Sequence, residues 1–156
     1  MNKPIIGRQA PDFSGVDQHG RTISLQDLKG KKVVLFFYPK DDTPGCTAEA
    51  CDLRDNEQAL AAQGYRVIGV SPDDGASHRK FIEKFDLPFD LIADTDLNII
   101  KAYGVWGLKK FMGREYEGVL RTTFLLDEKG VVQEIIDKVK TKEHASQILA
   151  TTNQHG

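Results

Sequence analysis

Two cysteines five residues apart offer the clearest chemistry in this sequence. Cys46 closes a proline-containing segment, residues 38–46, Cys51 follows it, and the chain has no other cysteine. Thr43 and Pro44 are residue types favoured at the N-cap and first position of a helix, which predicts that Cys46 lies in the first helical turn. Free backbone N–H groups and the positive end of the helix dipole stabilise an anion there. The position therefore favours a nucleophilic thiolate; the alternative is a buried cysteine that serves only as a small core residue.

The spacing of the two cysteines limits what they can do together. Disulfide oxidoreductases typically carry Cys-x-x-Cys, whereas four residues separate Cys46 from Cys51. On a regular helix this spacing places the two Cα atoms ~8–9 Å apart. A disulfide cannot span more than about 7 Å between Cα atoms without backbone movement. We therefore expect the first turns of the helix to unwind if these cysteines ever form a disulfide.

The four histidines do not suggest a metal centre or a base for the cysteine. They are scattered along the chain, at His19, His78, His144 and His155, and none is near either cysteine in sequence. The paired spacing of structural zinc sites is missing, and so is a glycine-rich phosphate loop of the usual pattern. We expect each histidine to occupy a surface or turn position, and we expect neither a metal nor a cofactor.

Composition is that of an ordinary globular protein. The chain has 156 residues, 40% of them hydrophobic and 28% charged, with a net charge of -2. This balance gives no electrostatic reason to bind nucleic acid or an anionic membrane. No apolar run approaches the roughly 18 residues of a membrane span, and the first residues lack the apolar core of a signal peptide. We expect one domain, residues 1–156, in the cytoplasm, where lasting disulfides are rare.

Hydrophobic patterns predict alternating strands and helices. Strands are expected at 12–16 and 22–25 as an N-terminal hairpin, then at 33–38, 65–71, 90–93, 119–126 and 131–136; helices are expected at 44–63, 77–85, 97–103 and 143–150. This order predicts an α/β fold of the thioredoxin-like kind, with a mixed central sheet and helices on both faces. Residues 105–117 fit neither pattern, and we interpret them as a loop over the core or as a wall of the active site.

Charged residues near the cysteines have plain interpretations when taken one by one. Arg121 lies within an otherwise apolar predicted strand, where it could point to solvent or toward a site. Glu49 and Arg54 flank the cysteines on the predicted helix and are interpreted as solvated or ion-pairing. The charges at 40–42 are interpreted as solvated loop residues that tune the local potential at most.

Several segments together resemble a known family. Pro39, Thr43 and Cys46 form Pro-x-x-x-Thr-x-x-Cys, which resembles the active-site signature of peroxiredoxins. The second cysteine, Cys51, makes the segment similar to the bacterioferritin-comigratory-protein, or PrxQ, subfamily. The likeness extends to residues 7–13, 38–54, 104–107, 111–113 and 121–127, which is nearly the whole chain.

The resemblance implies a mechanism and a role for each matching residue. It makes Cys46 the peroxidatic cysteine, which attacks a peroxide and becomes a sulfenic acid, and Cys51 the resolving cysteine of an intrachain disulfide. Thr43 would hydrogen-bond the peroxide, Pro39 would shield the pocket from water, and Arg121 would stabilise the thiolate and the charge on the peroxide oxygens. Hydrogen peroxide and organic hydroperoxides are the implied substrates, thioredoxin or sometimes glutaredoxin the implied reductant, and a monomer the implied state.

Two other functions remain open on the sequence. A general disulfide oxidoreductase would use the same thiols, although the Cys-x-x-Cys spacing is missing. A non-catalytic binding module or holdase chaperone on the same fold would need none of Pro39, Thr43, Cys46 and Arg121.

Overall fold

A five-stranded mixed sheet forms the centre of the molecule. The computed structural model describes residues 3–155, and its central strands lie in the order β5, β4, β3, β8, β9. Their bounds are Lys32–Phe37 (β3), Tyr65–Ser71 (β4), Asp90–Ala93 (β5), Thr122–Leu126 (β8) and Val132–Ile136 (β9). Strands β3, β4 and β5 run parallel, while β8 is antiparallel to both β3 and β9. The mixed sheet predicted from the sequence is therefore present.

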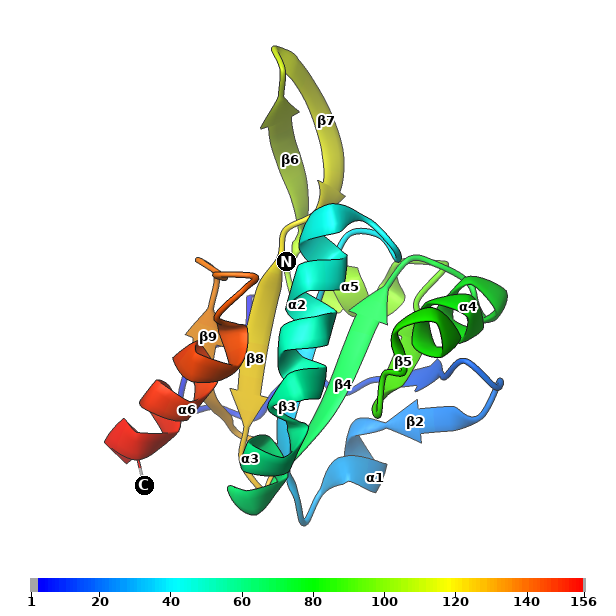
Figure 1. The fold of residues 1–156 in the computed structure, drawn as a ribbon. Coiled ribbons are helices and arrows are strands. Elements are labelled where there is room, and N and C mark those ends of the chain that lie inside the picture. Colours follow the sequence, from blue (N-terminus) through cyan, green and yellow to red (C-terminus); the bar gives the residue numbers. More distant parts are fainter. Residues whose placement is uncertain (1–2, 156) are drawn as a thin grey trace.

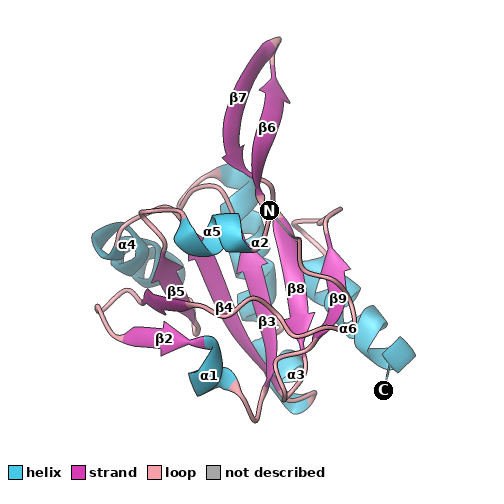
Figure 2. Cartoon of the chain, turned by 180° about the vertical axis from the view of Figure 1, so that it is seen from behind, coloured by secondary structure: helices cyan, strands magenta, loops and turns pink. Residues whose placement is uncertain are grey.

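Helices cover both faces of this sheet. They are α1 (Leu25–Leu28), α2 (Pro44–Asp55), α3 (Glu57–Ala62), α4 (Gly75–Phe85), α5 (Asn98–Ala102) and α6 (His144–His155). Helices α2, α4 and α6 lie on the face seen in Figure 1, and α1 and α5 lie on the opposite face (Figure 2). No helix among residues 3–155 has the length and apolar character required to cross a bilayer.

The central strand β3 supplies both halves of the core because side chains alternate along a strand. Val33, Leu35 and Phe37 pack on the α1 and α5 side. Val34 and Phe36, followed by Tyr38, pack on the α2, α4 and α6 side. This double burial explains why the run at 33–38 is continuously apolar rather than alternating.

The predicted helix at 44–63 is two helices. Asn56 ends α2 with φ -112° and ψ 15° and begins α3. Its side-chain amide donates to the carbonyl oxygen of Asp52 at 2.9 Å. The backbone N–H of Asn56 donates to the same carbonyl at 3.2 Å, so both the backbone and the side chain of Asn56 close the end of α2.

Two hairpins accompany the sheet, and only one was predicted correctly. The N-terminal hairpin is confirmed as β1 (Ser14–Val16) paired with β2 (Thr22–Ser24). Residues 105–117 were interpreted as a loop over the core or as a wall of the active site. The loop is wrong, because most of them lie in β6 (Trp106–Phe111) and β7 (Arg114–Val119), which project away from the body (Figure 1). Their two-residue turn, Met112 and Gly113, has positive φ at both positions, as a tight hairpin turn requires.

Candidate active site

Strand register brings Arg121 to the loop that leads into the helix carrying Cys46. Phe37, the last residue of β3, is paired with Thr122, the first residue of β8. Arg121 therefore lies beside the carboxyl end of β3, where the chain leaves toward α2. The prediction that Arg121 sits within a strand is wrong, because β7 ends at Val119 and β8 begins after Arg121. A position between strands lets its side chain turn toward the start of α2.

Cys46 lies in the first turn of α2, as predicted. Thr43 is the N-cap, Pro44 is the first helical residue, and the N–H of Thr47 donates to the carbonyl of Thr43 at 2.8 Å. Cys46 is buried, with 2% of its surface exposed, while Cys51 is half-buried in the same helix. Both thiols are free, and α2 continues unbroken from one to the other.

Thr43 caps the helix by position but not with its hydroxyl. Its Oγ1 donates to the carbonyl oxygen of Lys40 at 2.8 Å instead of accepting from the helix. A hydroxyl that donates one hydrogen bond keeps two lone pairs for accepting others. Thr43 therefore keeps the capacity to accept a hydrogen bond at the start of α2. Pro39 is half-buried in the same connecting loop.

Arg121 joins the cysteine to a buried acid. Its Nη2 donates to Sγ of Cys46 at 3.3 Å, and its Nη1 donates to Oε1 of Glu49 at 2.6 Å. A Cβ at Gly45 would lie 3.1 Å from Nη2, so glycine leaves room for the guanidinium over the helix start. Burial opposes the charge of Arg121, but Glu49 and Cys46 more than offset it, so the pKa of Arg121 rises above its ordinary value.

Glu49 is a site residue that sequence reasoning missed. Of its two interpretations, ion-pairing is confirmed by the contact with Arg121, and solvated is wrong because Glu49 is fully buried. Burial raises the pKa of Glu49 to about 7, although the adjacent Arg121 opposes that rise. A signal was available in the spacing, because Cys46, Glu49, Ala50 and Leu53 follow the i, i+3, i+4, i+7 pattern of a core-facing stripe. An acid on that stripe should have been expected to be buried.

Comparison with known proteins agrees with this geometry. The sequence pattern of the AhpC/TSA family matches residues 6–135. Peroxiredoxin Bcp of Bacillus subtilis is 49% identical over 146 residues, covering 94% of this chain and 93% of the relative. Peroxiredoxin Bcp of Escherichia coli K12 is 41% identical over 155 residues, covering 99% of each chain. The chain belongs to the AhpC/TSA family of peroxiredoxins.

A solved structure supports the same assignment. The bacterioferritin comigratory protein of Xanthomonas campestris, whose structures concern its alkyl peroxide reduction activity, superposes with a TM-score of 0.85. It is 34% identical, and the match covers 92% of this chain and 91% of that one. This peroxiredoxin is thus a thiol-dependent peroxidase on the thioredoxin-like fold predicted from its sequence.

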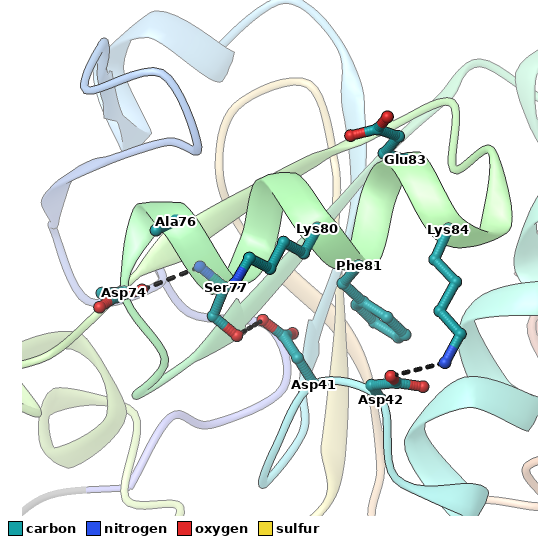
Figure 3. Close-up of a pocket in the computed structure, with 9 residues that line it drawn as sticks. All are labelled: Asp41, Asp42, Asp74, Ala76, Ser77, Lys80, Phe81, Glu83 and Lys84. Atoms are coloured by element: carbon teal, nitrogen blue, oxygen red, sulfur yellow. Dashed lines mark hydrogen bonds and ion pairs between the residues drawn. The ribbon is translucent and has the colours of Figure 1, made fainter.

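Asp41 departs from its sequence interpretation as a solvated loop charge. The peroxiredoxin buries this carboxylate where it accepts from Tyr38 Oη at 2.6 Å, Ser77 Oγ at 2.8 Å and His78 Nδ1 at 2.7 Å. Burial, and then Asp41 itself, raises the pKa of Tyr38, so the phenol stays protonated and donates. Asp41 therefore ties the loop before Cys46 to helix α4, as Figure 3 shows for Ser77. In the same loop, Asp42 pairs with Lys84 at 2.8 Å in an exposed ion pair.

The histidines were placed incorrectly in two cases. His19 is exposed, as expected, but His78 and His144 are fully buried. The side chain of His155 lies outside the described residues. His78, Asp41 and Asp73 hold ligand-type atoms within 4.8 Å of one another, close enough for a cation. Those atoms already serve internal hydrogen bonds, since Asp73 Oδ2 accepts from Ser71 Oγ at 2.7 Å.

Two hollows are lined by residues of this region. A cavity of about 420 Å³ is lined by Arg121, together with Lys109, Leu120 and Phe124, although neither cysteine lines it. A broader hollow of about 710 Å³ lies between Asp41 and helix α4 (Figure 3). Neither cysteine nor Arg121 lines the broader hollow, so its size does not make it the catalytic pocket. Burial lowers the pKa of Lys109, and Arg121 lowers it further, which marks this side of the sulfur as electropositive.

Proposed function

We propose that Cys46 is the peroxidatic cysteine of this peroxidase. The single observation that carries the proposal is the 3.3 Å contact between Nη2 of Arg121 and Sγ of Cys46 at the start of a helix. A guanidinium and free helical N–H groups both favour a thiolate over a thiol. The thiolate attacks one peroxide oxygen and the O–O bond breaks. The leaving oxygen takes a proton and departs as water or an alcohol, leaving Cys46 as a sulfenic acid.

Two side chains would assist this step. Arg121 carries its charge next to the sulfur, so it can also stabilise the negative charge that develops on the leaving oxygen. The hydroxyl of Thr43 already donates to the carbonyl oxygen of Lys40, so it would accept a hydrogen bond from the peroxide O–H. Pro39 would keep water from the pocket. These roles are the ones that the family resemblance assigns to the same positions.

Resolution would follow through Cys51. Its thiol attacks the sulfenic acid, a disulfide forms between Cys46 and Cys51, and water leaves. A dithiol reductant, thioredoxin or glutaredoxin, would then exchange the disulfide back to two thiols. Both cysteines lie in the intact helix α2, so its first turns must unwind before the sulfurs can meet. We propose hydrogen peroxide and organic hydroperoxides as substrates, and a cytoplasmic monomer whose residues 1–156 form one domain.

Stopped-flow fluorescence of Trp106, followed first with peroxide and then with thioredoxin, tests the cycle. Trp106 begins β6 and packs against the core next to the Arg121 segment, so it should report changes there. Cys46→Ser should abolish peroxide consumption. Cys51→Ser should still form a sulfenic acid, which stalls or turns over only with external thiols. Full activity of the Cys46→Ser variant would overturn the proposal.

A further inference from the structure

An unpaired carboxylate oxygen lies behind the contact between Arg121 and Cys46. Oε2 of Glu49 has no hydrogen-bond partner among the described residues, although no part of Glu49 is exposed. It lies 3.6 Å from Nε2 of His144, which is equally buried on helix α6. A buried acceptor without a donor is costly, and each one in a native structure calls for a physical explanation. The pair therefore needs an explanation beyond packing.

The hydrogen bonds around His144 fix which nitrogen carries its proton. The side-chain oxygen of Gln147 accepts from the backbone N–H of Lys140 at 2.9 Å, and its amide nitrogen donates to the carbonyl of Lys138 at 2.9 Å. Since this oxygen also faces Nδ1 of His144 at 2.9 Å, Nδ1 must be the protonated nitrogen. In the neutral ring, Nε2 then has only a lone pair, which accepts from Thr123 Oγ1 at 2.7 Å.

An ionised Glu49 beside a neutral His144 therefore has no donor for Oε2, because Nε2 carries no proton and its single lone pair already accepts from Thr123 Oγ1. One added proton changes this, either on Oε2 of Glu49, which neutralises the carboxylate, or on Nε2 of His144, in which case Thr123 Oγ1 becomes an acceptor. We propose that Glu49 and His144 share one exchangeable proton. His144 is then a positioning residue: through the charge of Glu49 it controls how strongly Arg121 stabilises the thiolate of Cys46. This inference rests on the proposed role of Cys46.

The proton changes the electrostatics of the sulfur through Arg121. An ionised Glu49 holds Nη1 at 2.6 Å and neutralises part of the guanidinium charge. A protonated Glu49 leaves more of that charge for the sulfur of Cys46 on Nη2. The reactive form of the cluster is therefore the one in which Cys46 has lost its proton while Glu49 retains one.

The environment of the pair sets where the proton resides. Burial raises the pKa of Glu49 to about 7 and lowers the pKa of His144, so Glu49 binds the proton first as the pH falls. Asp52 faces both groups from α2 and favours their protonated forms, while Arg121 opposes proton binding at both. Lys109, from β6, adds positive charge near Arg121 and Cys46. These are the charged groups that must be considered in interpreting a pH profile.

The pH dependence of Cys46 oxidation tests the proposal. His144→Gln puts a permanent amide donor near Oε2, which should stabilise ionised Glu49 and remove the proton near neutral pH. We expect the second-order rate constant with hydrogen peroxide to fall roughly three- to tenfold relative to the wild type near pH 6, and to stay nearly equal near pH 8. His19→Gln, on the exposed turn, is the matched control and should follow the wild type at both pH values. A reduction that is the same at all pH values would show a structural role only and overturn the proposal.

A double-mutant cycle provides the second criterion. In a Glu49→Gln background there is no carboxylate to protonate, so adding His144→Gln should not change the pH profile further. An effect of His144→Gln that persists in that background would contradict the coupling. If His144→Gln does not fold, nuclear magnetic resonance of the His144 ring nitrogens in the Cys46→Ser protein provides the test without peroxidase activity.

The resonance experiment separates failure of this inference from failure of the proposed function. We expect an Nδ1-protonated ring whose Nε2 shift changes near pH 7, and we expect that change to disappear in Cys46→Ser/Glu49→Gln. A ring that is unaffected by Glu49→Gln would overturn the shared proton whether or not Cys46 reacts with peroxide. Conversely, a wild-type Cys46 that does not react would overturn the proposed function and leave the ring titration intact.

Discussion

Two buried pairs of a carboxylate and a histidine flank the start of helix α2, and they differ in how completely they are hydrogen-bonded. Asp41 accepts three side-chain hydrogen bonds, from Tyr38, Ser77 and His78. Nε2 of His78 lies 3.0 Å from the carbonyl oxygen of Ile92, so both ring nitrogens face an oxygen acceptor. The second pair, Glu49 and His144, leaves one carboxylate oxygen unpaired.

The Asp41 pair is a structural anchor, whereas the Glu49 pair can change its protonation state with pH. The Asp41 pair ties residues ahead of the helix to α4, where a fully satisfied network resists change. The Glu49 pair lies on the helix itself and contacts Arg121, which in turn contacts the sulfur. A cluster that lacks one proton can change state with pH, whereas a satisfied one cannot do so without losing a hydrogen bond. We infer that the loop stays fixed while the helix start reacts and moves.

The largest effect should come from breaking the satisfied pair. Asp41→Ala leaves His78, Tyr38 and Ser77 without their acceptor in a buried site, so we expect a loss of about 3–5 kcal/mol in the free energy of unfolding. Urea denaturation measures it, with Asp42→Ala as a control in the same loop. A loss below about 1 kcal/mol for Asp41→Ala would show that the network is not an anchor.

The unpaired acid should make stability depend on pH in the opposite sense to an ordinary acid. The pKa of Glu49 rises from 4.5 to about 7 on folding, so the folded state binds more protons between these values. Stability should therefore decrease as the pH rises from about 4.5 to about 7, by about 3 kcal/mol, and stay lower above that range. Urea denaturation across this range should show a smaller decrease in Glu49→Gln, and an identical decrease in both proteins would contradict the assignment.

Arg121→Lys should slow the oxidation of Cys46 by about 100-fold. Lysine keeps the charge, but a single ammonium cannot reproduce the two contacts that the guanidinium makes with Glu49 and Cys46. Stopped-flow oxidation by hydrogen peroxide measures the rate. Arg54→Lys is the matched control, because Arg54 lies on α2 together with Cys46 and Glu49 but donates to the carbonyl of Phe85. Equal slowing in both variants would remove the special role of Arg121.

The smallest effect should come from the exposed ion pair in the same loop as the buried Asp41 pair. The ion pair between Asp42 and Lys84 has side chains that are 47% and 59% exposed, so solvent screens it. Lys84→Gln should change the free energy of unfolding by less than about 1 kcal/mol. A loss as large as that of Asp41→Ala would mean that the loop is held by its surface contacts rather than by the buried pair.

Sequence reasoning located the fold because its signals are local. The apolar run at 33–38 and the strand at 65–71 follow from burial on both faces, and β4 has the predicted bounds. The break at Asn56 was missed because it rests on the non-helical backbone angles of one residue within an otherwise helical pattern. The hairpin of β6 and β7 was missed because Met112 adopts positive φ, which the sequence does not signal for methionine.

Site residues were predicted from the sequence only where neighbouring residues in the chain determine their position. Cys46 could be placed from its neighbours Thr43 and Pro44, since capping is a property of adjacent residues. The buried state of Asp41 depends on His78, 37 residues away, and that of Glu49 depends on Arg121, 72 residues away. Contacts of this range arise from strand register and helix packing, which composition and periodicity do not contain.

Amide hydrogen exchange of residues 44–52 tests the central claim most directly, that Cys46 and Cys51 cannot pair while the first turns of α2 are formed. The reduced protein should protect these amides, and one equivalent of peroxide should remove the protection as the disulfide forms. Cys51→Ser, oxidised in the same way, should keep its protection because no disulfide can form. Equal protection of residues 44–52 in the reduced protein and in the disulfide form would contradict the account.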